Sequence, residues 1–208
     1  MTNNGAVESF EIERKYEVAD EAALPSAEAF AAVGLRLGAL EAHELRAAYF
    51  DTPDGGLASR RLALRRREGG KDAGWHLKAK GEHGARELLW PPAAEMPEGL
   101  LGEVEPHLGA EGLARLGAIA TLRTHRMTAM LFDASGAAVV ELADDRVDAV
   151  NELTGREQRW REWEAELMPG APEALLELVE PLLVEAGAVR VRGTSKIQKT
   201  MQAEGAAR

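Results

Sequence analysis

The stretch FEIERKYEV, residues 10–18, divides its side chains into two sets when it is read with a period of two. Successive side chains of a β-strand point to opposite faces, so the stretch is predicted to be a strand with one apolar and one ionic face. The ionic face carries Glu11, Glu13, Lys15 and Glu17. Two carboxylates two residues apart can share a divalent cation, and the neighbouring ammonium can hold an anion. For one strand alone, an ionic face that lies in water is the simpler interpretation.

The same alternation returns in several later segments, and the sign of the charge differs between them. Two segments are basic on one face. The first carries Arg61, Arg65 and Arg67 on that face, and the second carries His76, Lys78 and Lys80. One segment is acidic on one face, with Glu162, Glu164 and Glu166. A weaker acidic segment carries Glu141 and Asp145. The chain therefore combines basic and acidic ionic faces in one sheet.

A barrel closed with its ionic faces inward accounts for this pattern, because the apolar faces would then pack under helices outside it. Charges confined to such a tunnel are unfavourable unless they are paired or neutralised. Arginine forks match phosphate oxygens, and carboxylates are hard ligands that suit Mg²⁺ or Mn²⁺. A triphosphate with its metal ion satisfies both demands. The metal would neutralise charge and orient water, while the cations would stabilise charge on the phosphate oxygens.

Glycine and proline residues mark turns that divide the chain into segments, and these segments predict eight or so antiparallel strands with a few helices. This is an α+β fold in one domain over residues 1–208. After the first strand, the strands are expected at residues 43–51, 60–68, 74–80, 85–90, 122–133, 137–145, 159–167 and 189–191. Helices are expected at residues 20–33, within 106–119, at 172–187, and from 194 onward.

Composition excludes several classes of protein. The formal net charge of −10 argues against general nucleic-acid binding, which leaves a basic footprint. The absence of cysteine excludes disulfides and thiol chemistry. The apolar stretches are too short to span a membrane, and residues 1–8 lack the features of a signal peptide. We therefore expect a cytoplasmic protein with a small-molecule partner, no membrane partner, and an oligomeric state that the sequence leaves open.

The ordered motifs of the chain resemble the CYTH domain of the triphosphate tunnel metalloenzymes. Its signature, Glu-x-Glu-x-Lys, matches Glu11, Glu13 and Lys15. Further matches follow in order over nearly the whole chain: residues 49–52, 64–67 and 77–81, then Arg86, Arg123, Arg126, residues 144–145, the acidic segment and residues 195–196. The resemblance implies an eight-stranded antiparallel closed β-barrel with flanking helices, and substrates that contain a triphosphate group.

The resemblance also implies the roles of individual residues. The residues expected to hold Mg²⁺ or Mn²⁺ are Glu11, Glu13, Asp145, Glu162, Glu164 and Glu166, and the choice among the last three stays open. The expected triphosphate ligands are Lys15, Arg65, Arg67, Lys78, Lys80, Arg86, Arg123, Arg126 and Lys196. Lys15, Glu11 and Glu13 form the expected catalytic group. Alternation turns Arg66 outward, and His76 and His125 are interpreted as surface residues.

Three functions compete. The first is a metal-dependent triphosphatase, with inorganic triphosphate as the first candidate substrate and thiamine triphosphate or nucleoside triphosphates as others. The second is an adenylate cyclase of class IV, which would need an adenine-binding surface that the sequence does not reveal. The third is a polyphosphate- or nucleotide-binding module without turnover. A pure anion binder has no need of the carboxylates, so the presence of both ionic faces favours an enzyme.

Overall fold

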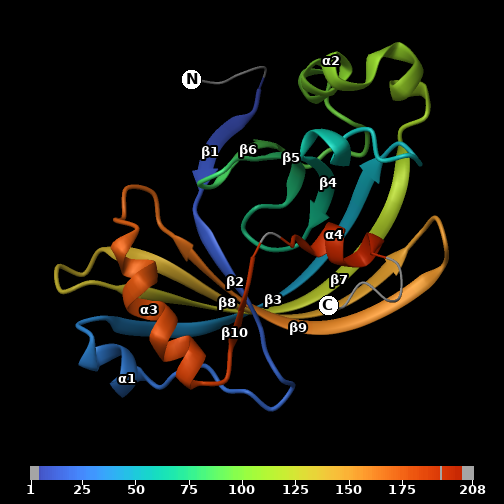
Figure 1. Cartoon of the computed structure of the whole chain (residues 1–208). Coiled ribbons are helices and arrows are strands. Elements are labelled where there is room, and N and C mark those ends of the chain that lie inside the picture. Colours follow the sequence, from blue (N-terminus) through green and yellow to red (C-terminus); the bar gives the residue numbers. More distant parts are fainter. Residues whose placement is uncertain (1–4, 193, 203–208) are drawn as a thin grey trace.

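The computed structural model describes residues 5–192 and 194–202, and within them ten antiparallel strands form one sheet (Figure 1). The strands are β1 (Val7–Glu11), β2 (Glu13–Glu17), β3 (Arg36–Asp51), β4 (Leu62–Glu68), β5 (Gly74–Lys80), β6 (Ala85–Trp90), β7 (Gly117–Phe132), β8 (Ala138–Asn151), β9 (Arg156–Leu167) and β10 (Val189–Val191). The helices are α1 (Ala27–Ala32), a 3₁₀ turn η1 (Ala58–Arg60), α2 (Glu98–Ala114), α3 (Ala174–Glu185) and α4 (Lys196–Met201).

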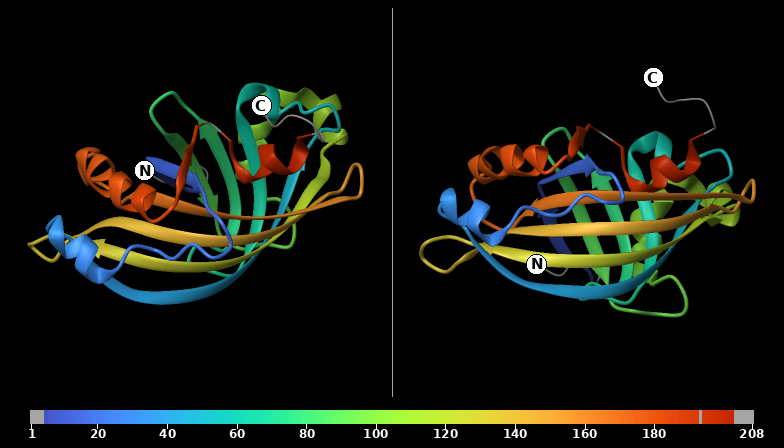
Figure 2. Two further views of the ribbon diagram at one scale, coloured as in Figure 1. Left: turned by 60° about the horizontal axis from the view of Figure 1, so that its bottom comes forward. Right: turned by 90° about the horizontal axis from the view of Figure 1, so that it is seen from below.

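The sheet is not the closed eight-stranded barrel that the sequence predicts. Its order is β1-β6-β5-β4-β3-β7-β8-β9-β2-β10, and in the described part of the chain no ladder joins the first strand to the last. The predicted first strand is split at Ile12, because Glu11 pairs with Ala85 of β6 whereas Glu13 pairs with Glu166 of β9. The chain at Ile12 nevertheless connects two strands from opposite ends of this order. The sheet curves accordingly, as Figure 2 shows.

Most predicted elements are present, with changes at their ends. The expected helix at residues 20–33 is reduced to α1, because Pro25 restrains the residue before it and the Ser26 side chain caps the helix at Ala29 N. The helix expected within residues 106–119 begins earlier, as α2, and Gly109 interrupts it with non-helical angles. No helix among the described residues is both long enough and apolar enough to cross a membrane.

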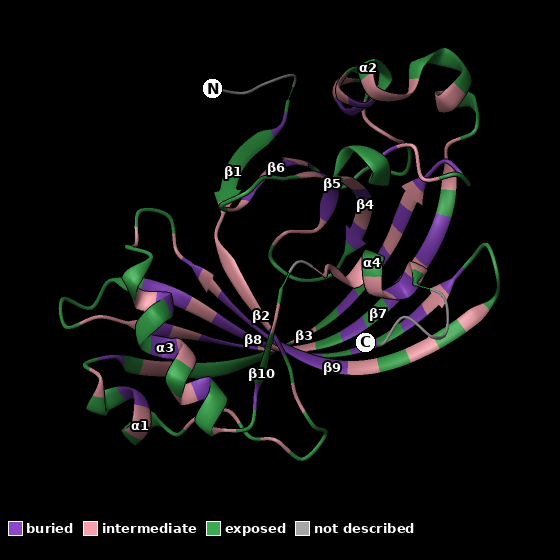
Figure 3. Cartoon of the chain, viewed as in Figure 1, coloured by how far each residue is buried: buried purple, intermediate pink, exposed green. Residues whose placement is uncertain are grey.

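Apolar side chains gather in three clusters, of which two lie on the outer side of the sheet, as predicted, and one lies on its inner face. One cluster lies under α1 and α3 and contains Trp163, and a second lies under α2 and contains Leu64 and Trp75. A third, smaller cluster is covered by Ile197 and Met201 of α4. The buried stretches of the long strands can be followed in Figure 3. The inner face of the curved sheet therefore carries the ionic side chains together with the third cluster, whose Tyr49 and Ala47 lie opposite Arg65 and Arg67.

The turn between β3 and β4 is built around the buried carboxylate of Asp51. That carboxylate accepts hydrogen bonds from the backbone N–H groups of Thr52, Leu57 and Ala58, at 2.7, 2.8 and 2.9 Å. The turn delivers Arg61 in the left-handed conformation, with φ of 60°, which is uncommon for a residue other than glycine. Asp51 therefore fixes the start of the strand that carries the arginines.

We expect Asp51→Ala to lower the free energy of unfolding by about 3 kcal/mol, because two buried backbone donors and a third, partly buried one lose a charged acceptor. Urea denaturation followed by circular dichroism measures this change. Asp54→Ala, in the same turn but with an exposed side chain, is the matched control and should change stability by less than about 0.5 kcal/mol. Equal effects of the two substitutions would contradict the role of Asp51.

Candidate active site

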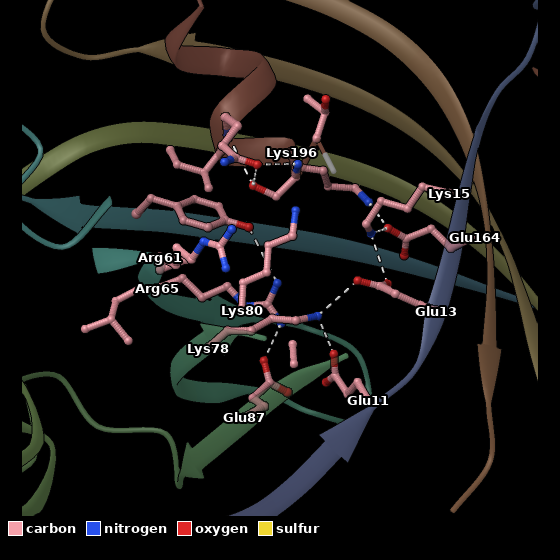
Figure 4. Close-up of a pocket in the computed structure, with 18 of the residues that line it drawn as sticks. Glu11, Glu13, Lys15, Arg61, Arg65, Lys78, Lys80, Glu87, Glu164 and Lys196 are labelled. Atoms are coloured by element: carbon pink, nitrogen blue, oxygen red, sulfur yellow. Dashed lines mark hydrogen bonds and ion pairs between the residues drawn. The ribbon is translucent and has the colours of Figure 1, made fainter. Parts of the chain in front are cut away.

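The concave side of the sheet encloses a cavity of about 1360 Å³. This volume exceeds the roughly 300–1,000 Å³ of common small-molecule pockets, so it accommodates a triphosphate with room to spare. Most of the side chains predicted for the site line it, and Figure 4 shows several of them pointing toward one another. These lining residues are Glu11, Glu13, Lys15, Arg65, Arg67, Lys78, Lys80, Arg126, Glu164, Glu166 and Lys196.

Strand register explains why these side chains meet. Residues directly opposite each other in an antiparallel pair project from the same face of the sheet. Lys15 lies opposite Glu164, and Glu13 lies opposite Glu166. Lys78 likewise lies opposite Glu87 on the neighbouring β6. The period-two pattern and the pairing together place acidic and basic side chains around one space.

Three carboxylates, which we call the triad, form a compact buried group: Asp145, Glu162 and Glu164. One oxygen from each lies within 4.8 Å of the others. The Lys196 ammonium contacts all three carboxylates, at 2.7, 2.6 and 2.8 Å respectively. Arg126 binds Asp145 through two hydrogen bonds of 2.7 and 2.6 Å and contacts Glu164 at 2.7 Å. Lys15 also pairs with Glu164.

Cations therefore compensate the triad. Burial alone would raise the pKa of the Glu164 carboxyl, but Lys15, Lys196 and Arg126 outweigh burial and hold that pKa well below its usual range. The pKa of Asp145 is likewise lowered against the effect of burial, by Lys196 and Arg126. The neighbouring cations thus keep the Asp145 and Glu164 carboxyls ionised in spite of their burial.

A second acidic group, which we call the glutamate group, is not balanced in this way. It consists of Glu11, Glu13 and Glu166. Burial and a hydrogen bond with Glu87 raise the pKa of Glu11 to about 7, although Lys78 opposes the shift. Burial and repulsion from Glu11 and Glu13 raise the pKa of Glu166 to about 8. Lys15 and Lys78 lower the pKa of Glu13 against the effect of burial, so the under-compensated carboxyls of the group are those of Glu11 and Glu166.

This imbalance predicts a stability effect that depends on pH. The pKa of Glu166 is raised from 4.5 to about 8, so the folded protein holds a proton that the unfolded chain releases, and stability falls as pH rises between these values. We expect Glu166→Gln to stabilise the metal-free protein at pH 8.5 by about 2 kcal/mol, or roughly 4–8 °C in melting temperature. At pH 4.5 the gain should be small. Thermal unfolding with a chelator at both pH values tests this, and equal gains would contradict it.

The basic side of the cavity is formed by β4 and β5. Arg65 contacts Glu87 at 3.2 Å, and Arg67 pairs with Asp72. Within residues 5–192 and 194–202, the Nε atoms of both arginines are nevertheless buried without a hydrogen-bond partner. Burial and the neighbouring Arg65 lower the pKa of Arg67, which reflects the crowding of cations there. An anion in the cavity would supply acceptors for these donors.

Lys80 and Arg61 extend the basic wall, and both side chains are exposed. Burial, followed by the charges of Arg61 and Lys15, lowers the pKa of the Lys80 ammonium. Cations that lie close enough to lower one another's pKa form a site of positive potential, which attracts a polyanion.

Two of the predicted phosphate ligands do not reach the cavity. Arg86 pairs at 2.6 Å with Glu8 and is exposed, and Arg123 is exposed opposite Asp148. Alternation is the reason: Arg123 lies three residues from Arg126, and Arg86 next to Glu87, so each points away from the lining residue. Arg86 and Arg123 therefore lie on the opposite face of the sheet, and their prediction as phosphate ligands is wrong. The choice of Asp145 over its neighbour agrees with the structure, because Asp144 pairs with Arg161 away from the cavity.

Several residues that line the cavity or support its walls were not predicted as site residues. His76 is fully buried rather than exposed, and it contacts Glu87 at 3.1 Å and the carbonyl of Asp72 at 2.8 Å. Burial alone would raise the pKa of Glu87, but His76 and Arg65 lower it. Pairing the two hairpin segments at residues 74–80 and 85–90 would have found Glu87, because the pairing sets it opposite Lys78. Tyr49 also lines the cavity, as do Arg61 and Glu141, which alternation had placed on the ionic faces without a site role.

Comparison with known proteins agrees with these motifs. The family model of the CYTH domain matches residues 9–201. The chain belongs to the CYTH family. Uncharacterized proteins from two strains of Mycobacterium tuberculosis are 33% identical over 207 residues, and the match covers 93% of this chain but only 40% of theirs. This CYTH chain thus spans less than half the length of those relatives.

Solved structures show the same fold. A proposed adenylate cyclase from Bacillus halodurans aligns with a TM-score of 0.58 and 21% identity, over 94% of this chain and 99% of the other. A proposed adenylyl cyclase from Hippeastrum, described as having a dominant triphosphatase activity, aligns with a TM-score of 0.54 and 21% identity, over 91% and 94% of the two chains. At this identity the likeness establishes the CYTH fold alone.

Proposed function

We propose that this CYTH protein is a Mg²⁺- or Mn²⁺-dependent triphosphatase that hydrolyses a phosphoanhydride bond, with inorganic triphosphate as the first candidate substrate. The observation that carries the proposal is the division of one cavity into two walls. Arginines with unpartnered buried donors, Arg65 and Arg67, form one wall, and an under-compensated glutamate group stands across from them. A phosphate chain with a divalent ion supplies what each wall lacks.

The residues present fit a divalent cation. The oxygens of the triad are close enough to share one ion, and the raised pKa values of Glu11 and Glu166 show a surplus of negative charge in the glutamate group. Carboxylate oxygens are the hard ligands that Mg²⁺ and Mn²⁺ prefer. The residues that would hold the metal are Glu11, Glu13, Asp145, Glu162, Glu164 and Glu166. When bound, the ion supplies charge neutralisation and an activated water.

The chain's own cations would bind and orient the substrate. Arg65 and Arg67 offer planar donors to non-bridging phosphate oxygens, whereas Lys15 and Lys80 act as point charges. These charges stabilise the transition state of phosphoryl transfer, in which negative charge is spread over the oxygens of the transferred group. Glu87 and His76 contact the Arg65 guanidinium at 3.2 and 3.5 Å, and these contacts fix its position.

The experiment that tests this function measures phosphate release from inorganic triphosphate, thiamine triphosphate and ATP. Each substrate is supplied with Mg²⁺, with Mn²⁺, or with a chelator, and ATP reactions are also analysed for cyclic AMP. Phosphate release that needs a metal and is fastest with inorganic triphosphate is the expected result. Cyclic AMP with pyrophosphate as the main products would identify a cyclase instead. Tight triphosphate binding without any turnover would identify a binding module.

A further inference from the structure

Lys196 occupies the place in the triad that a cation would take. Its ammonium lies 2.6–2.8 Å from one oxygen of each triad carboxylate, and its side chain is only 10% exposed. The same three carboxylates are the group whose oxygens lie close enough together to share a metal ion. An ammonium nitrogen and a metal ion cannot both stand among the same oxygens, because they would repel each other at contact distance.

Lys196 also stands between the cavity and the rest of the triad. Lys196 and Glu164 are among the lining residues, whereas Asp145 is fully buried and Glu162 is nearly so. Figure 4 shows the Lys196 side chain reaching down from its helix toward Glu164 and Lys15. An ion that enters from the cavity therefore meets the ammonium before it meets the two deeper carboxylates.

Of the three cations that the structure describes around the triad, Lys196 is the one whose ammonium can most easily move away from the carboxylates. Arg126 projects from the long strand β7 and holds Asp145 through two parallel hydrogen bonds, and Lys15 projects from β2. Lys196 is instead the first residue of the short helix α4, which Ser195 caps and whose Ile197 and Met201 pack on the sheet. A lysine has a long flexible stem, so the ammonium can swing into the cavity while the helix stays in place.

We propose that the Lys196 ammonium and the divalent ion are alternative occupants of the triad, so that metal binding transfers Lys196 to the bound phosphate chain. The inference rests on the proposed function and adds that the metal ion can enter the triad only as Lys196 leaves it. While Lys196 occupies the triad, three cations balance three carboxylates, and the triad has little affinity for a further ion. Entry of the ion requires release of the Lys196 ammonium, and the released ammonium gains a new partner only where a polyanion is present. Binding of the ion is therefore coupled to binding of the phosphate chain. Metal and substrate therefore bind with positive cooperativity.

The test measures Mn²⁺ binding by electron paramagnetic resonance of the free ion, in the absence of substrate. Lys196→Met removes the competing charge and keeps an unbranched side chain, so Mn²⁺ affinity should rise about tenfold or more. The matched control is Lys199→Met on the same helix, since Lys199 pairs with Glu17 outside the triad. Its Mn²⁺ affinity should equal that of the unaltered protein. Thermal unfolding with a chelator verifies that both variants fold.

A second measurement follows the lysine itself. Amine-reactive labelling read by mass spectrometry should modify Lys196 slowly in the metal-free protein and several-fold faster at a Mn²⁺ concentration that saturates the unaltered protein, whereas the labelling of Lys199 should not change. Equal Mn²⁺ affinity in the unaltered protein and Lys196→Met, with unchanged labelling, would overturn the exchange and leave the metal-dependent triphosphatase intact. Failure of both proteins to bind Mn²⁺ would overturn the exchange and the proposed metal together.

Discussion

Glu13→Gln should reduce metal-dependent hydrolysis of inorganic triphosphate by about a hundredfold or more, because a Lewis-acid metal contributes several kcal/mol of transition-state stabilisation. Glu13 belongs to the glutamate group and also contacts Lys15 at 3.0 Å and Lys78 at 3.2 Å. An amide keeps the size of the side chain but offers only a neutral dipole to a hard cation. Phosphate release at saturating triphosphate, over a range of Mg²⁺ concentrations, measures the loss.

The matched control for this substitution is Glu17→Gln. Glu17 lies on the same strand, β2, but its side chain is exposed and pairs with Lys199. Hydrolysis by this variant should stay within about twofold of the unaltered protein. Full metal-dependent activity of Glu13→Gln, or an equal loss in both variants, would refute the assignment of Glu13 to the metal.

Arg65→Ala should weaken the binding of inorganic triphosphate about ten- to a hundredfold, since charged hydrogen bonds to phosphate are worth roughly 1.5–3 kcal/mol each. Arg65 lines the cavity, and its buried Nε has no hydrogen-bond partner among the residues that the structure describes. Arg67→Ala should behave in the same way, because Arg67 lines the same wall and also has an unpartnered Nε. Calorimetric titration with triphosphate and Mg²⁺ measures the affinity.

Arg66→Ala is the control that strand alternation provides. Arg66 points to the outer side of β4, where its guanidinium lies 6.0 Å from the ring centroid of Trp75. Its removal should leave triphosphate affinity unchanged within about twofold. If Arg66→Ala were the damaging substitution and its neighbours were silent, the arginines would not bind the substrate as proposed.

The sequence by itself determined which face each side chain of a strand belongs to. Alternation is a local property of an extended backbone, so Glu13 and Lys15 share a face whatever β2 pairs with, although the break at Ile12 puts Glu11 on the separate strand β1. The same holds for Arg65 and Arg67, and the structure places all five around the cavity. The outward packing of Trp75 and Trp163 followed from the same reasoning. The motif order also sufficed to predict the CYTH family.

Only the tertiary structure decided which faces meet and how they are compensated. The split at Ile12 and the ten-stranded open order depend on which partner each half of the first strand selects, and that choice lies in β6 and β9, far along the chain. Arg86 and Arg123 were misplaced because motif order does not fix the phase of each strand. Lys196 reaches the triad across long sequence separations, and Glu166 holds its proton because other carboxylates surround it. Burial and Coulomb energies depend on distances in space, and these are set when the strands pair.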